Sequence, residues 1–318
     1  MNDLKTVLKL QNQIIQPDTH SKLVSITDQH LLFEDGSKFY IHNGTPVLFG
    51  AESIFNVDNI ISQKTTTQDK KQMDTSNVKN FIRRKMLPSL CKDFDCEKRY
   101  QNLSKQIPNG STVLIIGTGE KGSYYKTMFP HCDVITSDVH NEFQPDYIFD
   151  GHYIPFEDAS FDAVLAAQVI EHTINPWKFC SELQRVTKND GLLQIEAPQN
   201  YPYHAEPYDF FRFTFTGMRS LFPQCDVINT EITEGNAAMV AVTTSNYLVN
   251  TSSKRSIRIA WLIVSRIALG WLKYLDRLQP ALNKRTVSMP KGYAFTFKKD
   301  SKKRTQVELL NEFYTLSR

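Results

Sequence analysis

The chain has 318 residues, of which 41% are hydrophobic and 22% are charged. This composition excludes a disordered or fibrous protein and is typical of a globular one. The five cysteines are odd in number and form no C-x-x-C pair, which argues against a zinc ribbon or a redox dithiol. Scattered cysteines and the lack of a recognisable signal peptide favour a cytoplasmic location.

The net charge of +3 is unevenly distributed along the chain. Residues 251–304 hold fourteen Lys/Arg and two Asp, a net charge of +12, so the remainder of the chain is acidic. A basic segment on an acidic body indicates an anionic partner surface, or else a solvated basic helix.

The N-terminal residues have the pattern of short strands joined by tight turns. Asp35-Gly36 and Asn43-Gly44 are hairpin signals that lie between apolar stretches. We therefore predict a small β-rich module over residues 1–60.

The rest of the chain divides by composition. Residues 63–76 are polar and predict a linker, and residues 77–106 have a weakly amphipathic helical pattern, which together give a linker-and-helix region over 61–108. A second domain is expected over 109–300, followed by a tail over 301–318.

From residue 112 onward strands and helices alternate. Asn175-Pro176 is a strong helix start, and that helix is expected to end at Asn189-Asp190-Gly191. The predicted strands are 112–117, 133–138, 146–150, 161–170 and 192–198. Continuous apolar strands that alternate with helices predict an α/β fold with a parallel sheet covered on both faces.

A glycine-rich turn follows the first of these strands. The spacing G-x-G-x-x-G at Gly117, Gly119 and Gly122 suits a chain that bends tightly around a nucleotide. Asp138 ends the next strand, where a carboxylate can accept both hydroxyl groups of a ribose. This pattern fits NAD and S-adenosylmethionine equally, and a purely structural glycine turn would also explain it.

Residues 150–198 separate these alternatives. The segment contains Ile154-Pro155-Phe156, Ser160-Phe161-Asp162, Glu171-His172 and a helix that carries Glu182 and Arg185. In order and spacing it resembles the class I S-adenosylmethionine-dependent methyltransferases of the type 11 kind. The resemblance implies a Rossmann-like, doubly wound, mostly parallel seven-stranded sheet with an antiparallel last strand.

The resemblance also implies the cofactor S-adenosylmethionine and the residues that hold it. Gly117 and Gly119 would face its methionine part, and Asp138 would hold the ribose. Asp150 would bind the adenine amino group, and Gln168–His172 would flank the sulfonium. Gly151 and His152 would line the adenine ring.

Two positions depart from the family pattern. An acidic residue usually precedes the first glycine by two positions, where this chain has Ile115, and the third glycine is displaced from Lys121 to Gly122. Glu120 is a candidate substitute for the missing acid.

The acceptor side is expected in residues 204–214, "HAEPYDFFRFT", which resemble a loop in one bacterial subset of these enzymes, several of them encoded near glycan functions. His204 and Asp209 would deprotonate a substrate hydroxyl or amine, and His172 is a further candidate base. The alternative is that Asp209 pairs with Arg212 to fix the loop while Thr214 caps a helix.

The last two strands are expected at 226–249 and 290–299, with a helical insertion at about 251–285. Residues 256–278 form a basic amphipathic helix that is interrupted by Arg258 and Arg266 too early to span a membrane. It could lie on an anionic membrane, form a lid or a dimer contact, or pack on its own domain.

The N-terminal module resembles the zinc-ribbon-like unit that precedes some methyltransferases, through Tyr40, Gly44 and Pro46-Val47-Leu48. No cysteine occurs before Cys91, so no metal is predicted.

The leading hypothesis is a methyltransferase that acts on an oxygen or nitrogen of a small molecule or glycan. The alternatives are a non-catalytic binding module and an NAD-dependent oxidoreductase. The acidic body argues against a nucleic-acid substrate.

Overall fold

The computed structural model describes residues 9–61, 81, 87–278, 282–283 and 285–316. The predicted linker at 63–76 lies outside the described residues, as does part of the helical region predicted at 77–106.

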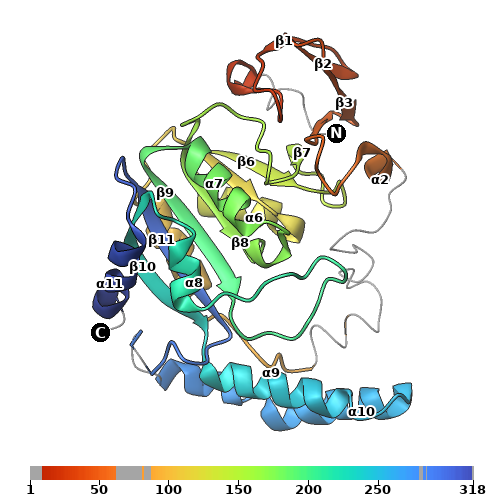
Figure 1. Ribbon diagram of the computed structural model, residues 1–318. Coiled ribbons are helices and arrows are strands. Elements are labelled where there is room, and N and C mark those ends of the chain that lie inside the picture. The colour runs from red at the N-terminus through yellow and green to blue at the C-terminus, as the bar shows by residue number, and fades with distance from the viewer. Residues whose placement is uncertain (1–8, 62–80, 82–86, 279–281, 284, 317–318) are drawn as a thin grey trace.

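Seven strands in the order β7-β6-β5-β8-β9-β11-β10 form the centre of the molecule (Figure 1). They are β5 (Thr112–Ile116), β6 (Asp133–Asp138), β7 (Tyr147–Phe149), β8 (Phe161–Ala167), β9 (Thr187–Pro198), β10 (Cys225–Glu234) and β11 (Gly292–Lys299). The strands from β5 to β9 pair in parallel, whereas β11 runs antiparallel to both β9 and β10. The α/β Rossmann-like sheet expected from the sequence, with its antiparallel last strand, is therefore confirmed.

Helices cover both faces of this sheet because its strands are apolar on both sides. Val113 and Ile115 pack with α5 (Cys96–Ser104) and α6 (Gly122–Met128) on one face. Leu114 and Ile116 belong to the core on the other face, which also receives α7 (Pro176–Val186) and α8 (Phe215–Ser220). Alternate residues of one strand thus serve two cores, as expected for a central parallel strand.

The N-terminal strands extend the same sheet. The strands β1 (Leu23–Ile26), β2 (His30–Phe33), β3 (Lys38–His42) and β4 (Thr45–Leu48) pair antiparallel in chain order, with the predicted turns at Gly36 and at Asn43-Gly44. Asn43 and Gly44 both have positive φ, as a tight hairpin turn requires. Strand β4 then pairs in parallel with β7, so the described part of the chain forms one sheet of eleven strands.

The start of α7 agrees with the sequence. Asn175 accepts a hydrogen bond from the amide of Lys178, and Pro176 is the first helical residue. The helix ends at Val186, earlier than expected, because β9 already begins at Thr187.

The prediction of a strand over residues 226–249 is wrong for the second half of that range. Strand β10 ends at Glu234, and α9 (Asn236–Val249) follows it. Asp276 accepts hydrogen bonds from the amides of Gly235, Ala237 and Ala238, so the cap of this helix comes from a residue about forty positions later. The apolar, β-branched composition of 236–249 concealed a helix whose cap is distant in sequence.

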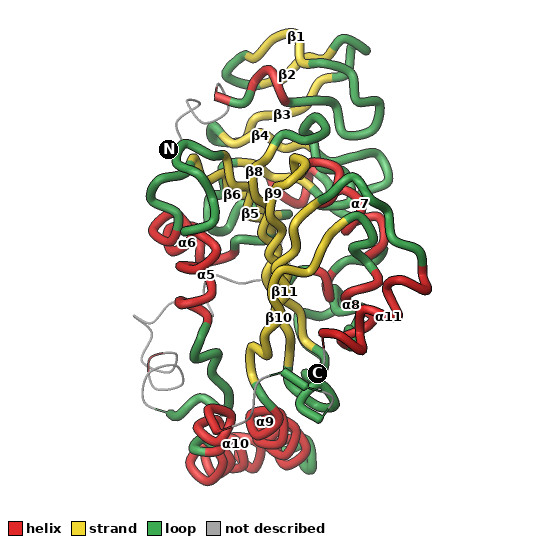
Figure 2. The backbone as a smooth tube through the Cα atoms, turned by 90° about the vertical axis from the view of Figure 1, so that its left-hand side faces the viewer, coloured by secondary structure: helices red, strands yellow, loops and turns green. Residues whose placement is uncertain are grey.

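The predicted basic helix is present as α10 (Arg255–Leu269), and a 3-10 segment, η5 (Leu272–Leu278), follows it. Helices α9 and α10 lie side by side at the end of the molecule opposite strands β1 to β3 (Figures 1 and 2). The remaining short elements are η1 (Gln11–Gln13), α2 (Val57–Ile61), η3 (Gly119–Lys121), η4 (Ile170–His172) and α11 (Gln306–Leu316). Within the described residues, no helix is both long and apolar enough to cross a membrane.

Candidate active site

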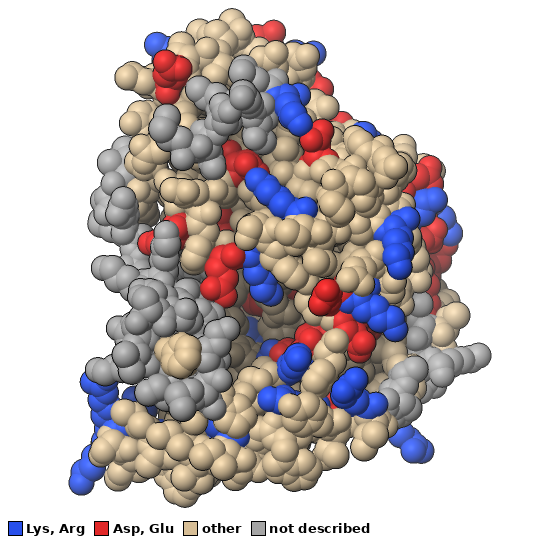
Figure 3. All heavy atoms as spheres, turned by 180° about the vertical axis from the view of Figure 1, so that it is seen from behind, with Lys and Arg blue, Asp and Glu red and all other residues tan. Residues whose placement is uncertain are grey.

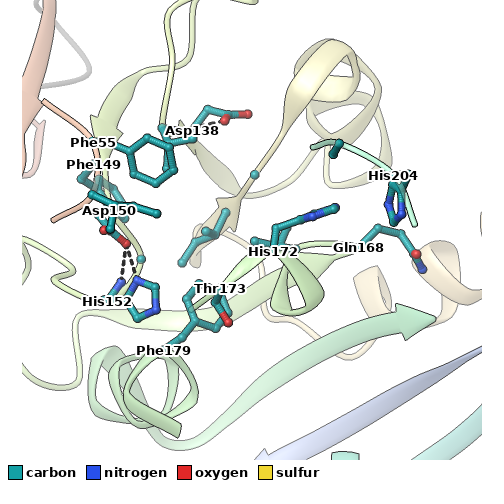
Figure 4. A pocket seen from close by; sticks show the side chains of 17 residues that line it. Phe55, Asp138, Phe149, Asp150, His152, Gln168, His172, Thr173, Phe179 and His204 are labelled. Carbon is teal, nitrogen blue, oxygen red and sulfur yellow. Dashed lines mark hydrogen bonds and ion pairs between the residues drawn. The ribbon is translucent and has the colours of Figure 1, made fainter. Parts of the chain in front are cut away.

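A cavity of about 370 Å³ lies at the carboxyl ends of β5, β6, β7 and β8. This is the edge of a doubly wound sheet at which ligands bind. Its walls include eight of the residues that the sequence analysis selected: Gly117, Asp138, Asp150, Gly151, His152, Gln168, His172 and His204. In Figure 4, Asp150 and His152 lie on one side of the cavity and His172 and His204 on the other.

The glycine turn approaches the cavity closely. Gly117 has φ +68°, and a Cβ atom at this position would lie 2.4 Å from Val169 Cγ2. Gly119, also at positive φ, donates its amide to Asp138 Oδ2 at 2.9 Å. The turn is therefore fixed to the end of β6, and any side chain at Gly117 would collide with the opposite wall.

Asp138 is 7% exposed and lines the cavity. Its Oδ1 accepts the amide of Val139, and His140 Nε2 lies 3.3 Å from the same oxygen. The carboxylate thus lines the cavity in a position fixed by the amides of Gly119 and Val139.

Asp150 ends its strand in a network of hydrogen bonds. Its Oδ1 accepts from the amide of His152 and lies 2.6 Å from His152 Nδ1, while Oδ2 accepts from the Ser53 hydroxyl at 2.7 Å. The amide of Asn175 donates to His152 Nε2, so the ring proton is on Nδ1. Burial would raise the pKa of Asp150, but the hydrogen bonds from His152 and Ser53 outweigh it, and the pKa is lowered.

The neighbouring Gly151 gives the cavity its shape. A Cβ atom on Gly151 would lie 2.3 Å from Cε2 of Phe179, whose ring lines the cavity. The absence of a side chain therefore allows this aromatic wall to approach the end of β7.

Gln168 follows β8 with φ +58°, and its amide donates to the carbonyl oxygen of Glu196. Non-glycine residues in this conformation are strained and cluster at functional sites. The next turn, η4, brings Glu171 and His172 beneath the loop that carries His204.

Glu171, His172 and His204 form a cluster at this end of the cavity. One side-chain oxygen or nitrogen from each lies within 4.8 Å of the others. Glu171 is fully buried, and among the described residues neither carboxyl oxygen has a hydrogen-bond partner. Burial raises the pKa of Glu171 to about 8.

The hydrogen bonds and burial of the two histidines determine which ring nitrogens carry protons. His172 Nδ1 lies 2.5 Å from the carbonyl oxygen of Tyr208, which can only accept, so Nδ1 carries the proton and Nε2 has the lone pair. Burial lowers the pKa of His172 and of His204 below the ordinary value of 6.5, so both rings are neutral near pH 7. His204 meets His172 edge to face, with 4.9 Å between ring centroids.

Asp209 does not line the cavity. Arg212 donates to both of its carboxyl oxygens, at 2.6 and 2.7 Å, and the amide of His204 donates to Oδ2 at 2.8 Å. Thr214 caps α8 through the amide of Gly217. Asp209 therefore positions the loop and His204, which agrees with the alternative drawn from the sequence.

Other residues differ from the sequence expectation. Gly119 and Glu120 do not line the cavity, and Glu120 is exposed. Sequence reasoning missed Ile54 and Phe55, which reach the cavity from the segment after β4. It also missed Thr173 and several apolar lining residues: Ile116, Val139, Phe149, Phe179 and Ala205.

The strand order, the glycine turn and the acidic residues at the ends of β6 and β7 define a nucleotide-binding domain of the Rossmann-like class. Comparison with known proteins specifies it further. Residues 116–195 match the family model described as a methyltransferase domain. This segment therefore resembles a methyltransferase domain.

The chain is similar to one curated protein in sequence and to two solved structures in fold. An uncharacterized methyltransferase of Mycobacterium sp. (strain KMS) is 29% identical over 103 residues, which cover 29% of this chain and 41% of the relative. The chain thus matches less than half the length of this relative. A SAM-dependent methyltransferase from Archaeoglobus fulgidus aligns with a TM-score of 0.42 and 16% identity, over 64% of this chain and 93% of that one. An N-methyltransferase of Haemonchus contortus, solved with phosphomonomethylethanolamine and S-adenosylhomocysteine, aligns with a TM-score of 0.43 and 12% identity, over 66% and 53%.

Proposed function

We propose that the chain transfers the methyl group of S-adenosylmethionine to an oxygen or nitrogen of a small molecule or glycan. The observation that carries this proposal is the cavity itself, which has two buried carboxylates, Asp138 and Asp150, at the ends of adjacent strands. The methyltransferase-domain match over 116–195 supports the same reaction.

The cavity residues fit the cofactor in one orientation. Asp138 would accept the ribose hydroxyl groups, and Asp150, kept ionised by its hydrogen bonds, would accept from the adenine amino group. Gly151 and His152 would border the ring. Gly117 would leave room for the methionine part of the cofactor. In this orientation the reactive sulfur would lie near Gln168 and His172.

His172 is the base in this proposal. S-adenosylmethionine, when bound, supplies an activated methyl group on a positively charged sulfur. The acceptor oxygen or nitrogen would take this methyl group and leave S-adenosylhomocysteine, and His172 Nε2 would accept the proton that the acceptor loses. The hydrogen bond to Tyr208 fixes the tautomer that leaves this nitrogen able to accept.

His204 and Asp209 have supporting roles. His204 borders the acceptor end of the cavity, and Asp209 with Arg212 holds its loop. Orientation of the acceptor in line with the methyl group supplies much of the rate enhancement in such a displacement.

Cofactor binding is tested by isothermal titration with S-adenosylhomocysteine. We expect binding by the unaltered chain and a loss of about tenfold or more in affinity for Asp138→Asn, because a charge-assisted hydrogen bond is removed. Lys98→Met, a change at an exposed residue of α5, is the control. Absence of binding would favour a non-catalytic module, and binding of NADH instead would favour an oxidoreductase.

The reaction is tested by mass spectrometry of small-molecule and glycan acceptors for a gain of one CH₂ group. With an acceptor in hand, His172→Gln is expected to lower kcat by about 10²–10⁴-fold while S-adenosylhomocysteine affinity is retained. In the unaltered chain kcat should fall as the pH drops through a pKa below 6.5, since protonated His172 cannot accept.

Glu171 and the two histidines are also residue types that hold divalent cations, so the assay is repeated in EDTA. Loss of activity in EDTA that is restored by a divalent cation would overturn the assignment of His172 as a base. Methylation of RNA or DNA in place of the smaller acceptors would overturn the proposed acceptor class.

A further inference from the structure

Helix α10 and η5 contact the rest of the protein through their polar side. Ser265 is the buried residue of α10, and its hydroxyl lies 2.7 Å from that of Ser245 in α9. Lys273 is buried and donates to the carbonyl oxygen and hydroxyl of Ser89. Asp276 caps α9 through three amide groups. Ser265, Lys273 and Asp276 therefore attach this segment to the rest of the protein.

The apolar side of the same segment faces outward. Ile267 is 63% exposed, Trp271 56% and Leu278 80%. Six more large apolar residues of this segment are exposed on it: Ile257, Ile259, Ile263, Val264, Tyr274 and Leu275. We call these nine residues the α10–η5 face.

This arrangement reverses the usual amphipathic helix, whose apolar stripe faces the core. Scattered exposed apolar residues need no explanation, but a contiguous set on one helical segment marks an interaction site. Contact of these large apolar side chains with water is unfavourable, so covering the face would stabilise the protein.

The charges around the face indicate what covers it. Residues 254–278 contain six Lys/Arg and one acidic residue, Asp276, which points its carboxylate at the start of α9. Lys254, Arg255, Arg258 and Arg277 are exposed. Figure 3 shows the lower edge of the molecule as mainly uncharged surface with Lys and Arg at its ends.

We propose that the α10–η5 face lies on the surface of an anionic lipid bilayer, with Ile267, Trp271 and Leu278 entering the interface and the basic residues beside the headgroups. Tryptophan and tyrosine favour this depth. A second copy is a poorer occupant, since two copies meeting here would bring the same basic residues together without an exposed acid on the segment. The proposal does not depend on the methyl-transfer reaction.

The test is flotation of the full chain with vesicles of phosphatidylcholine alone or with phosphatidylserine added. We expect the chain to bind the anionic vesicles, with an affinity that falls as salt is added and a blue shift of tryptophan fluorescence on binding.

The double variant Ile267→Glu with Trp271→Asp should bind these vesicles about tenfold or more weakly. Because both side chains are exposed, the variant should fold, which circular dichroism checks. Val24→Glu, at a residue 59% exposed on β1, is the matched control.

Failure to bind anionic vesicles, or equal binding by the double variant, would overturn the proposal. So would light scattering that shows a dimer of the unaltered chain and a monomer of the double variant, because the face would then be a contact between copies.

Discussion

At the scale of single residues, Gly151 determines how closely an aromatic ring can approach the cofactor cavity. Gly151→Ala would place a methyl group 2.3 Å from Cε2 of Phe179, so the ring must move. We expect affinity for S-adenosylhomocysteine to fall by about tenfold, measured by isothermal titration, because overpacking costs about 1–3 kcal/mol. Gly122→Ala is the matched control, since its Cβ would meet only Thr136 Cγ2 at 4.0 Å. Equal effects of the two changes would contradict this explanation.

Glu171 gives a second residue-level prediction, in the pH dependence of stability. Its pKa in the folded protein, about 8, lies above the ordinary 4.5, so the folded state holds the proton more tightly than the unfolded state does. This contribution to stability is complete below pH 4.5 and is lost as the pH rises to 8, by about 1.4 kcal/mol per pH unit within that window.

Glu171→Gln removes this titration while nearly preserving the shape of the protonated side chain. Urea unfolding of both proteins between pH 5 and pH 9 should show the variant gaining stability relative to the unaltered chain as the pH rises. A difference between the two proteins that does not change with pH would show that Glu171 is ionised in the folded state across this range.

At the scale of elements, the segment after β4 joins the N-terminal strands to the candidate active-site cavity. Phe55 lines the cavity and stacks on Tyr208 of the acceptor loop, with 5.4 Å between ring centroids, while Ser53 donates to Asp150. We expect Phe55→Ala to weaken S-adenosylhomocysteine binding by about tenfold, because an aromatic wall is removed. Val24→Ala, also in the N-terminal strands but exposed, should leave titration unchanged. An unaltered affinity for Phe55→Ala would show that this segment only covers the sheet edge.

Sequence reasoning succeeded for local signals and failed for contacts between distant residues. Signals within a few residues were reliable: Asn175-Pro176 placed the start of α7, and apolar runs placed β5 and β6. Contacts between distant residues left no such signal. The Ser53–Asp150 hydrogen bond joins residues 97 positions apart, and Asp276 caps a helix that starts at Asn236.

For the candidate site, too, local motifs were informative and contacts between distant segments were not. The glycine turn and the family motif located seven of the cavity residues between Gly117 and His172, because spacing after a strand determines which side chains reach its end. It gave no information on Phe55, which enters from the N-terminal strands, and the pairing of Asp209 with Arg212 was one of two open alternatives until the contacts were known.

At the scale of the whole molecule, Arg99 joins α5 to the central sheet. It is 3% exposed and donates to Asp93, to Glu196 of β9 at 2.8 Å and to Glu231 of β10 at 3.2 Å. Burial would lower the pKa of Arg99, but Glu196 and Asp93 outweigh this effect and hold the pKa above its usual range. One guanidinium group therefore forms ion pairs with three carboxylates that come from three parts of the chain.

Arg99→Met would leave Glu196, which is 5% exposed, without its cation. Loss of one partner of a buried ion pair typically costs about 3–5 kcal/mol, because the remaining charge stays buried. We expect a loss of this size in the free energy of unfolding, measured by urea titration, whereas Lys98→Met on the exposed side of the same helix should change it little. Adding Glu196→Met should restore part of the loss by removing the uncompensated charge. If it restored none, the stabilisation would come from packing of the Arg99 side chain and not from its charge.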